Sequence, residues 1–138
     1  MIATPSVTLV IGTDLIAIAE VEASVARFGD RYLRRVFTDL ELDETRGHQQ
    51  GARLAARFAA KEAMLKALRV GDAAIPWRSI EVRRAADGAP EIQLHGAAAE
   101  LAESQGIADL ALSITHETAF AAAVVVGTKR PPTTSPST

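Results

Sequence analysis

The hydrophobic pattern of the chain centres on one long helical segment. Residues 52–68 contain neither glycine nor proline and are rich in alanine and leucine, a composition that favours helix formation. Plotted at about 100° per residue, the large apolar side chains gather on one side, namely Leu54, Phe58, Met64, Leu65 and Leu68. We therefore expect a central helix whose apolar side faces a hydrophobic core.

Charged residues accompany this apolar side. Lys61 falls inside it and Arg57 near its edge, whereas Glu62 and Lys66 lie one turn apart on the flank. The simplest interpretation is a core helix with a Glu–Lys surface pair, because long basic side chains can cover apolar surface. A polyanionic ligand is the alternative, since Arg and Lys bind phosphate oxygens and a carboxylate can share a divalent cation with them.

The remaining pattern alternates between short strands and helices. Period-two and β-branched runs predict strands at residues 7–11, 79–84, 91–94, 110–114 and 120–126. Helical spacing predicts helices at residues 18–28 and 96–105, a helical turn at 31–36, and a capping box from Thr38 to Glu41. The sequence predicts one α+β domain over residues 1–127, with an antiparallel-rich sheet against the central helix. Residues 128–138, rich in Pro, Ser and Thr, are expected to be disordered.

Several polar residues are candidates for function on local grounds. Asp14 follows the first strand, so it is either an N-cap of the next helix, which local sequence favours, or a metal ligand at a strand end. His116 lies in the expected turn between the last two strands, where an imidazolium could meet a phosphate. The basic run Arg31, Arg34 and Arg35 is either a solvated surface or a docking patch for an acidic partner.

Composition narrows the classes of function. The 138 residues suffice for one domain, the formal net charge of −2 gives no general attraction to nucleic acid, and cysteine is absent. Disulfides, thiolate catalysis and cysteine-bound metals are therefore excluded. No apolar run is long enough to span a membrane, and the N-terminus lacks the pattern of a signal peptide. We expect a cytoplasmic protein that binds neither membrane nor nucleic acid.

Three motifs occur in a distinctive order: Ile11-Gly12-Thr13-Asp14, the run RFAAKEAMLK from Arg57 to Lys66, and Ser113-Ile114-Thr115-His116. A Phe37-Thr38 to Glu41-Leu42 segment and an Asp87 to Pro90 turn lie between them in the same order. Together they resemble the holo-acyl-carrier-protein synthases, which are small 4′-phosphopantetheinyl transferases. The resemblance covers about residues 7 to 126, and it implies the 4′-phosphopantetheinyl transferase fold.

The resemblance implies an activity and a set of catalytic residues. Members transfer the 4′-phosphopantetheine arm of coenzyme A to a serine hydroxyl of an apo carrier protein and release adenosine 3′,5′-bisphosphate. By similarity, Asp14 and Glu62 hold Mg²⁺, with Mn²⁺ as a possible substitute, and Lys66 contacts the pyrophosphate of coenzyme A. Asp14, Glu62 and Lys66 are thus the expected catalytic residues.

The resemblance also implies how coenzyme A is bound. Arg57 and His116 are expected at its phosphates, including the 3′-phosphate. The turn formed by Asp87, Gly88 and Pro90 is expected to reach the adenine end of a coenzyme A held mainly by a neighbouring subunit. This expectation follows from the family, whose members commonly form trimers with active sites at subunit interfaces.

The carrier is the least defined partner. The resemblance places an acidic carrier protein on the first helical region, where Arg27, Arg31, Arg34 and Arg35 are the docking candidates. Many members have an acid where this chain has Ala17 and a basic residue near Glu20, so a fatty-acid, polyketide or peptide-synthesis carrier each remains open. Two other functions remain as alternatives: a metal-dependent phosphohydrolase of coenzyme A-like pyrophosphates, and a non-catalytic homologue that binds coenzyme A or a carrier.

Overall fold

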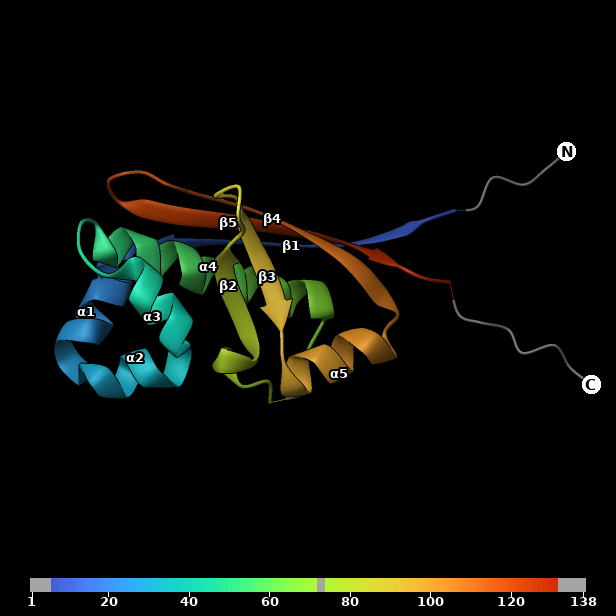
Figure 1. Cartoon of the computed structure of the whole chain (residues 1–138), viewed down its shortest axis with the longest axis horizontal. Helices are drawn as coiled ribbons and strands as arrows, with labels where there is room; N and C mark the ends of the chain where they lie inside the picture. Colours follow the sequence, from blue (N-terminus) through green and yellow to red (C-terminus); the bar gives the residue numbers. More distant parts are fainter. Residues whose placement is uncertain (1–5, 72–73, 132–138) are drawn as a thin grey trace, which may run out of the picture.

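A three-stranded antiparallel sheet with one long helix beneath it organises the structure (Figure 1). The computed structural model describes residues 6–71 and 74–131. Along the chain the elements are β1 (Thr8–Ala17), α1 (Ile18–Phe28), α2 (Asp30–Val36), α3 (Asp39–Thr45), α4 (Gln50–Leu68), a 3-10 turn (Trp77–Ser79), β2 (Ile80–Arg84), β3 (Pro90–Leu94), α5 (Gly96–Ser104), β4 (Ile107–His116) and β5 (Phe120–Lys129). The predicted α+β class is confirmed.

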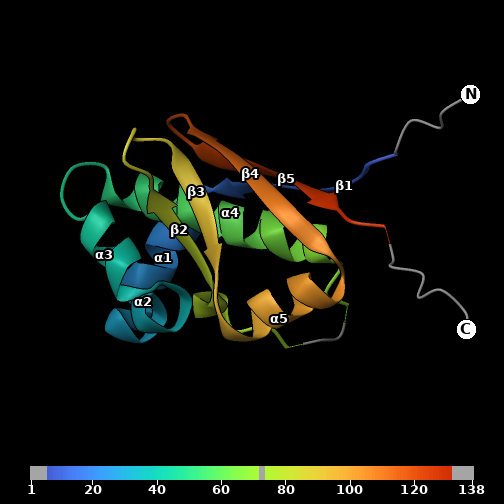
Figure 2. The ribbon, with the colours of Figure 1, turned by 45° about the vertical axis from the view of Figure 1, so that its right-hand side comes forward.

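The layers follow from the strand order β1-β5-β4, in which both neighbouring pairs are antiparallel. α4 lies along the inner face of this sheet, and the β2–β3 hairpin crosses α4 on the side away from it (Figure 2). The three short helices α1, α2 and α3 gather around the N-terminal half of α4, and α5 lies near its other end (Figures 1 and 2). α4 is thus the central helix that the sequence predicts.

The structure differs from the expected element bounds mainly in the length of the three strands of the large sheet. β1 continues to Ala17, which is the residue that precedes α1, so Asp14 lies inside the strand and the N-cap interpretation is wrong. β4 extends to His116, so the histidine ends a strand rather than lying in the turn. β5 reaches Lys129, so residues 128–129 belong to the strand and not to the expected tail. Residues 132–138 of that tail lie outside the described residues.

Small residues let α4 approach the sheet closely. Ala59, Ala63 and Ala67 are fully or almost fully buried on α4, and β1 passes over them at Gly12. A Cβ placed on Gly12 would lie 1.8 Å from the carbonyl oxygen of Ala63, which is far inside van der Waals contact. Because no side chain fits at this crossing, glycine at position 12 sets the distance between β1 and α4.

Lys61 is the buried cation within the apolar side of α4. Its side chain is fully buried with that of Glu41, and its Nζ donates to Glu41 Oε1 at 2.7 Å. The same Nζ also donates to the carbonyl oxygens of Trp77 and Ile80, while Glu41 Oε2 accepts from the backbone N–H of Val82 at 2.9 Å. Burial lowers the pKa of Lys61, and the charge of Glu41 opposes that shift. The pair therefore joins α3, α4 and β2 through satisfied polar groups.

A second carboxylate continues this network toward the surface. The capping box predicted at Thr38 is present, with Thr38 and Glu41 exchanging side-chain and backbone hydrogen bonds. Thr38 Oγ1 also donates to Glu81 Oε2 at 2.5 Å, and His95 Nε2 lies 3.2 Å from Glu81 Oε1. Burial raises the pKa of Glu81, but the hydrogen bonds from Thr38 and His95 and the charges of His95 and Arg83 lower it more, so its net shift is downward.

No helix among the described residues is long and apolar enough to cross a lipid bilayer.

Replacing Gly12 by alanine should disrupt the crossing of β1 and α4. The added methyl group would overlap the backbone of Ala63, so the strand or the helix must move, and overpacking of this kind costs about 1–3 kcal/mol or more. We expect a lower free energy of unfolding in denaturant titration. Thr8→Ala, on the exposed part of the same strand, serves as the control, and an unchanged stability of Gly12→Ala would contradict the close contact.

Glu81 should make the free energy of unfolding depend on pH in the acidic range. Its pKa is lower in the folded state than its ordinary value, so its stabilising contribution is present above the ordinary glutamate pKa and is lost as pH falls through the lowered folded value. Glu81→Gln should therefore reduce the loss of unfolding free energy in that acidic range. Glu100→Gln, on the exposed surface of α5, removes a carboxylate outside the network and serves as the control. Equal pH profiles for wild type and Glu81→Gln would argue against the network.

Candidate active site

The first candidate cluster lies where β1 crosses α4. Asp14 shares a strand face with Gly12, because side chains two residues apart point to the same side of a strand. Lys66 Nζ donates to Asp14 Oδ1 at 3.2 Å and to the carbonyl oxygen of Thr13 at 2.9 Å. Glu62 lies one helical turn before Lys66, and the charge of Asp14 acts on it. The close crossing at Gly12 thus brings two acids far apart in sequence to one cluster.

The two carboxylates of this cluster repel one another. Burial raises the pKa of Glu62, the charge of Asp14 raises it further, and Lys66 acts in the opposite direction. A divalent cation would relieve this repulsion, and Mg²⁺ typically takes one or two carboxylates and completes its shell with phosphate oxygens and water. The described residues hold no group of three or more His, Asp or Glu side chains that could bind a metal by themselves. The Asp14 and Glu62 pair therefore fits Mg²⁺ shared with an oxygen-rich ligand.

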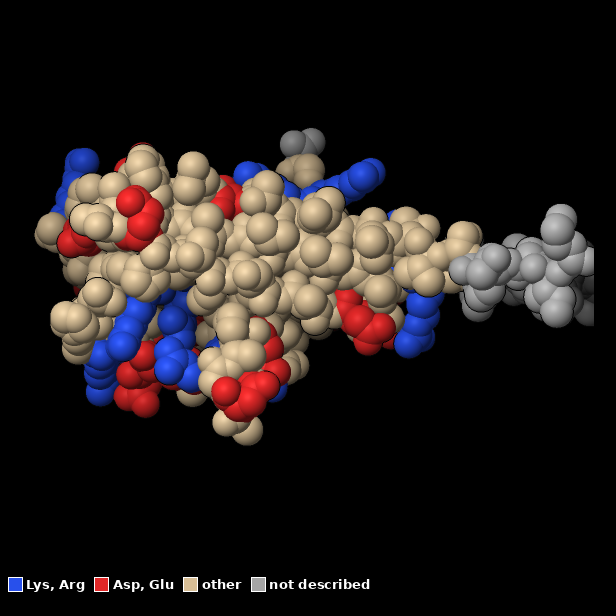
Figure 3. All heavy atoms as spheres, turned by 90° about the horizontal axis from the view of Figure 1, so that it is seen from above, with Lys and Arg blue, Asp and Glu red and all other residues tan. Residues whose placement is uncertain are grey.

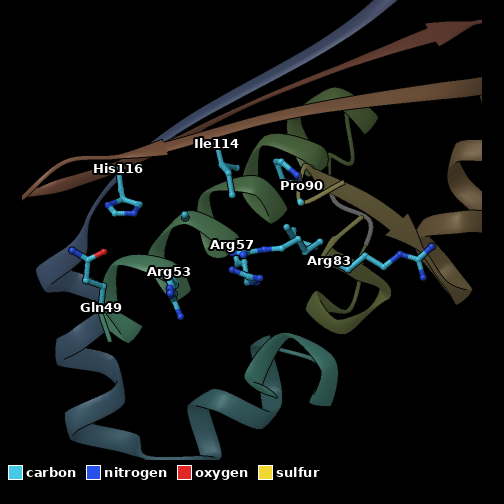
Figure 4. Close-up of a pocket in the computed structure, with 11 residues that line it drawn as sticks. Gln49, Arg53, Arg57, Arg83, Pro90, Ile114 and His116 are labelled. Carbon is cyan, nitrogen blue, oxygen red and sulfur yellow. The ribbon is translucent and has the colours of Figure 1, made fainter. Parts of the chain in front are cut away.

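The second candidate cluster is a cavity of about 380 Å³ beside the N-terminal half of α4 (Figure 4). Its walls come from the start of α4, from the β2–β3 hairpin and from the end of β4. The lining residues are Gln49, Arg53, Ala56, Arg57, Val82, Arg83, Arg84, Gly88, Pro90, Ile114 and His116. None of these is acidic, and four are arginines, so the cavity suits a phosphate group better than a cation.

Arg57 is the most buried cation of this cavity. Its side chain is only 6% exposed, and its Nη2 donates to Glu44 Oε2 at 2.9 Å. Its Nε is buried without a hydrogen-bond partner within the described part of the chain. A buried donor without a partner is energetically costly, and Arg57 also lines the cavity, so it is a candidate partner for an anion there.

The other basic residues of the cavity differ in direction. In Figure 4, His116 extends from β4 toward α4, whereas the guanidinium of Arg83 points away from the cavity. Arg53 lines the cavity from α4, and its Nη1 donates to the carbonyl oxygen of Arg46 at 3.4 Å. Arg83 donates instead to Glu91 Oε1 at 2.9 Å and to Gln93 Oε1 at 3.0 Å. Arg53, Arg57 and His116 are therefore the side chains placed to meet a bound anion.

Helix α4 separates the two clusters. Glu62 follows Arg53 by nine residues, which is about two and a half helical turns, so the two side chains leave opposite flanks of the helix. Asp14 lies on β1, at the edge of the sheet, and His116 on β4, at the other edge, with β5 between them. Within one chain the carboxylate pair and the cationic cavity thus open on different sides of α4.

The residues expected to contact coenzyme A divide between these two clusters. Arg57, Gly88, Pro90 and His116 line one cavity of a single chain, so the 87–90 turn accompanies the basic residues of its own chain. Lys66 belongs to the carboxylate cluster instead. Asp87 does not line the cavity; its Oδ1 accepts the backbone N–H of Ala89 at 2.9 Å and supports the turn.

Sequence reasoning missed three arginines of the cavity, Arg53, Arg83 and Arg84. Arg53 precedes Arg57 by four residues, so the two must share a helix flank, and this spacing was the available signal. Arg84 reaches the cavity from the end of β2, and no local pattern distinguished it from an exposed strand arginine. Lys66 acts on Glu62 through its charge, as expected, and it also contacts Asp14, which the helix pattern alone did not predict.

The arginines expected to dock a carrier lie on a separate face, formed by the end of α1 and by α2. Arg27, Arg31, Arg34 and Arg35 are all exposed. Arg31 and Arg35 border a shallow hollow whose other walls are apolar or aromatic: Phe28, Tyr32, Val36, Phe58 and Trp77. The geometry suits a partner that presents an apolar side chain surrounded by acids.

Comparison with known proteins gives consistent matches over most of the chain. Residues 10–125 match the family model described as the 4′-phosphopantetheinyl transferase superfamily. A holo-[acyl-carrier-protein] synthase of Moorella thermoacetica is 43% identical over 116 residues, covering 83% of this chain and 90% of the relative. The corresponding protein of Herpetosiphon aurantiacus is 44% identical over 126 residues, covering 86% and 98%.

Solved structures show the same fold. An ACPS–CoA complex of Chronobacterium ammoniagenes superposes with a TM-score of 0.78 at 30% identity, covering 90% of this chain and 99% of that one. The Helicobacter pylori holo-[acyl-carrier-protein] synthase in complex with coenzyme A gives a TM-score of 0.75 at 34% identity, covering 85% and 98%.

Proposed function

This chain belongs to the 4′-phosphopantetheinyl transferase superfamily, and from that premise we propose that it converts an apo carrier protein to its holo form. The donor is coenzyme A, the acceptor is a serine hydroxyl of the carrier, and the by-product is adenosine 3′,5′-bisphosphate. Relatives named for this activity and related structures holding coenzyme A support the assignment.

One observation carries the proposal: the chain has both a carboxylate pair with a lysine and an acid-free cationic cavity. Coenzyme A has two phosphate centres of different chemistry, a pyrophosphate and a 3′-phosphomonoester. We assign the pyrophosphate to Asp14, Glu62 and Lys66, because paired carboxylates can share Mg²⁺ with it. We assign the 3′-phosphate to Arg53, Arg57 and His116, because these donors line a cavity that has no acidic residue in its lining.

Asp14 and Glu62 are the residues that would hold Mg²⁺ or Mn²⁺, and the ion would supply charge neutralisation at the pyrophosphate. In the reaction, the serine oxygen forms a bond to the phosphorus that carries the pantetheine arm. The bond from that phosphorus to the leaving phosphate of the bisphosphate breaks, and the hydroxyl proton passes to water. Lys66 offsets negative charge on the leaving group, so positioning and electrostatics carry most of the catalysis.

A homotrimer would unite the two clusters that α4 separates. The outer face of the sheet is apolar and exposed: Leu9, Ile11, Leu15, Phe120 and Val124 are between 39% and 67% exposed. Figure 3, seen from above the sheet, shows a middle free of charged side chains with charges at its margins. Exposed apolar surface of this kind marks an interaction site. We propose that subunits meet through this face and that the cavity of one subunit completes the carboxylate cluster of the next.

The exposed arginines at the end of α1 and on α2 are the proposed docking surface for the acidic carrier. Arg31 and Arg35 flank the aromatic hollow, so a carrier could insert an apolar side chain there while its acids pair with the arginines. Opposite charge would speed and orient docking. The cytoplasm is the compartment that we propose for this reaction.

Replacing Glu62 should remove transfer without removing the fold. Glu62 is one of only two carboxylates in the proposed metal cluster, so Glu62→Ala should lower the rate by at least about 100-fold. The measurement is mass spectrometry of several apo carriers incubated with coenzyme A and Mg²⁺, with a gain of one phosphopantetheine as the readout. Glu100→Ala, on the exposed surface of α5, should keep the wild-type rate.

The same assay separates the alternatives. Release of the bisphosphate from coenzyme A without any carrier would identify a phosphohydrolase. Retention of coenzyme A or a carrier, with no mass gain for wild-type protein on any carrier, would identify a binding homologue. Either result would overturn the transferase proposal.

A charge on the outer face of the sheet should break the trimer. Ile11 is 66% exposed on β1, and burying an aspartate there without a partner is costly. Ile11→Asp should therefore shift the mass measured by light scattering toward the monomer and lower transfer in parallel. Leu40→Asp, on α3 and 40% exposed, is the control; a wild-type mass for Ile11→Asp would exclude this face as the interface.

A further inference from the structure

Glu44 contacts the cationic cavity from behind without lining it. It lies near the end of α3, and its side chain is 23% exposed. Glu44 Oε2 accepts from Arg57 Nη2 at 2.9 Å, and Oε1 lies 3.5 Å from the backbone N–H of Arg84 on β2. The carboxylate is thus placed between the two elements that carry cavity arginines.

The contact with Glu44 is made on the edge of the Arg57 guanidinium that carries Nε and Nη2, and it leaves Nη1 outside the contact. Nη2 is occupied by the carboxylate, whereas the buried Nε has no partner within the described residues. Guanidinium groups bind phosphate best when their planar fork is held in a fixed orientation. With α3 holding this edge, the guanidinium is kept in place beside the cavity that Arg53, Arg57 and His116 line (Figure 4).

We propose that Glu44 is a positioning residue that lets Arg57 distinguish coenzyme A from the analogue without its 3′-phosphate. The inference rests on the proposed function, which assigns the 3′-phosphate to this cavity. A free arginine side chain would have to lose conformational entropy on each binding event, whereas Glu44 orders it in advance. Glu44 therefore raises specificity although its own charge is negative.

The test compares two ligands that differ only at the 3′-position. Dissociation constants of coenzyme A and dephospho-coenzyme A are measured by calorimetry for wild type, Glu44→Ala, Glu44→Gln and Arg57→Ala. We expect wild type to bind coenzyme A more tightly than dephospho-coenzyme A. Glu44→Ala should reduce this ratio of affinities about tenfold, because only the affinity for coenzyme A falls. Glu44→Gln keeps an acceptor for Arg57 and should stay near wild type.

A double variant shows whether Glu44 acts through Arg57. Glu44→Ala combined with Arg57→Ala should lose no more preference than Arg57→Ala alone, since coupled residues are not additive. Asp43→Ala is the matched control on α3, because Asp43 forms an exposed ion pair with Arg46, and it should keep the full preference. If Glu44→Ala is too unstable to measure, Glu44→Met fills the space without the acceptor and should show the same loss.

The other outcomes overturn the inference in distinguishable ways. Equal weakening of both ligands by Glu44→Ala would show a purely structural role. Tighter binding of coenzyme A would show that Glu44 competes with the phosphate. If wild type binds neither ligand and modifies no carrier, the proposed function itself fails; if wild type prefers coenzyme A but Glu44→Ala does too, only the role of Glu44 fails.

Discussion

The structure depends on the close passage of β1 over α4 at Gly12. Only a residue without a side chain allows the strand to lie against the helix backbone at Ala63. That contact determines the position of Asp14, because side chains at positions i and i+2 of a strand lie on the same face. It therefore determines whether an acid near the N-terminus can meet Glu62 in the middle of the chain. The candidate metal cluster is a consequence of backbone packing rather than of local sequence.

Helix α4 can serve as both core and binding element because its buried cations have polar partners in the folded structure. Lys61 is completely enclosed, yet its ammonium group meets Glu41 and two backbone carbonyls. Arg57 is almost as enclosed; its Nη2 meets Glu44, and its Nε has no partner among the described residues. Burial of an unpaired charge is strongly unfavourable, so this difference separates a structural cation from one prepared for a ligand. Position on the helix alone would have classified the two residues together.

Sequence reasoning succeeded where the signal was local and failed where it was long-range. The bounds of α1 at Ile18–Phe28 match the prediction because the apolar spacing and Gly29 define both ends. The capping box at Thr38 was visible for the same reason. Asp14 was misplaced because Gly-Thr-Asp looks like a break, whereas pairing with β5, opposite Ala123, keeps the chain extended. The role of Glu44 could not be predicted, because it depends on how α3 folds back against α4.

The arrangement of charges on α4 gives a reason why a short chain would associate with further copies of itself. The proposed ligand has two phosphate centres and would contact both flanks of α4, whose other sides are covered by the sheet and the hairpin. One chain offers the carboxylates at the β1 edge and the cavity at the β4 edge, with α4 between them. The apolar outer face of the sheet gives chains a reason to associate, since its burial releases water from apolar surface. Association would then bring the carboxylate pair of one subunit toward the cationic cavity of its neighbour. A ligand could contact both clusters without having to pass around the α4 of a single chain.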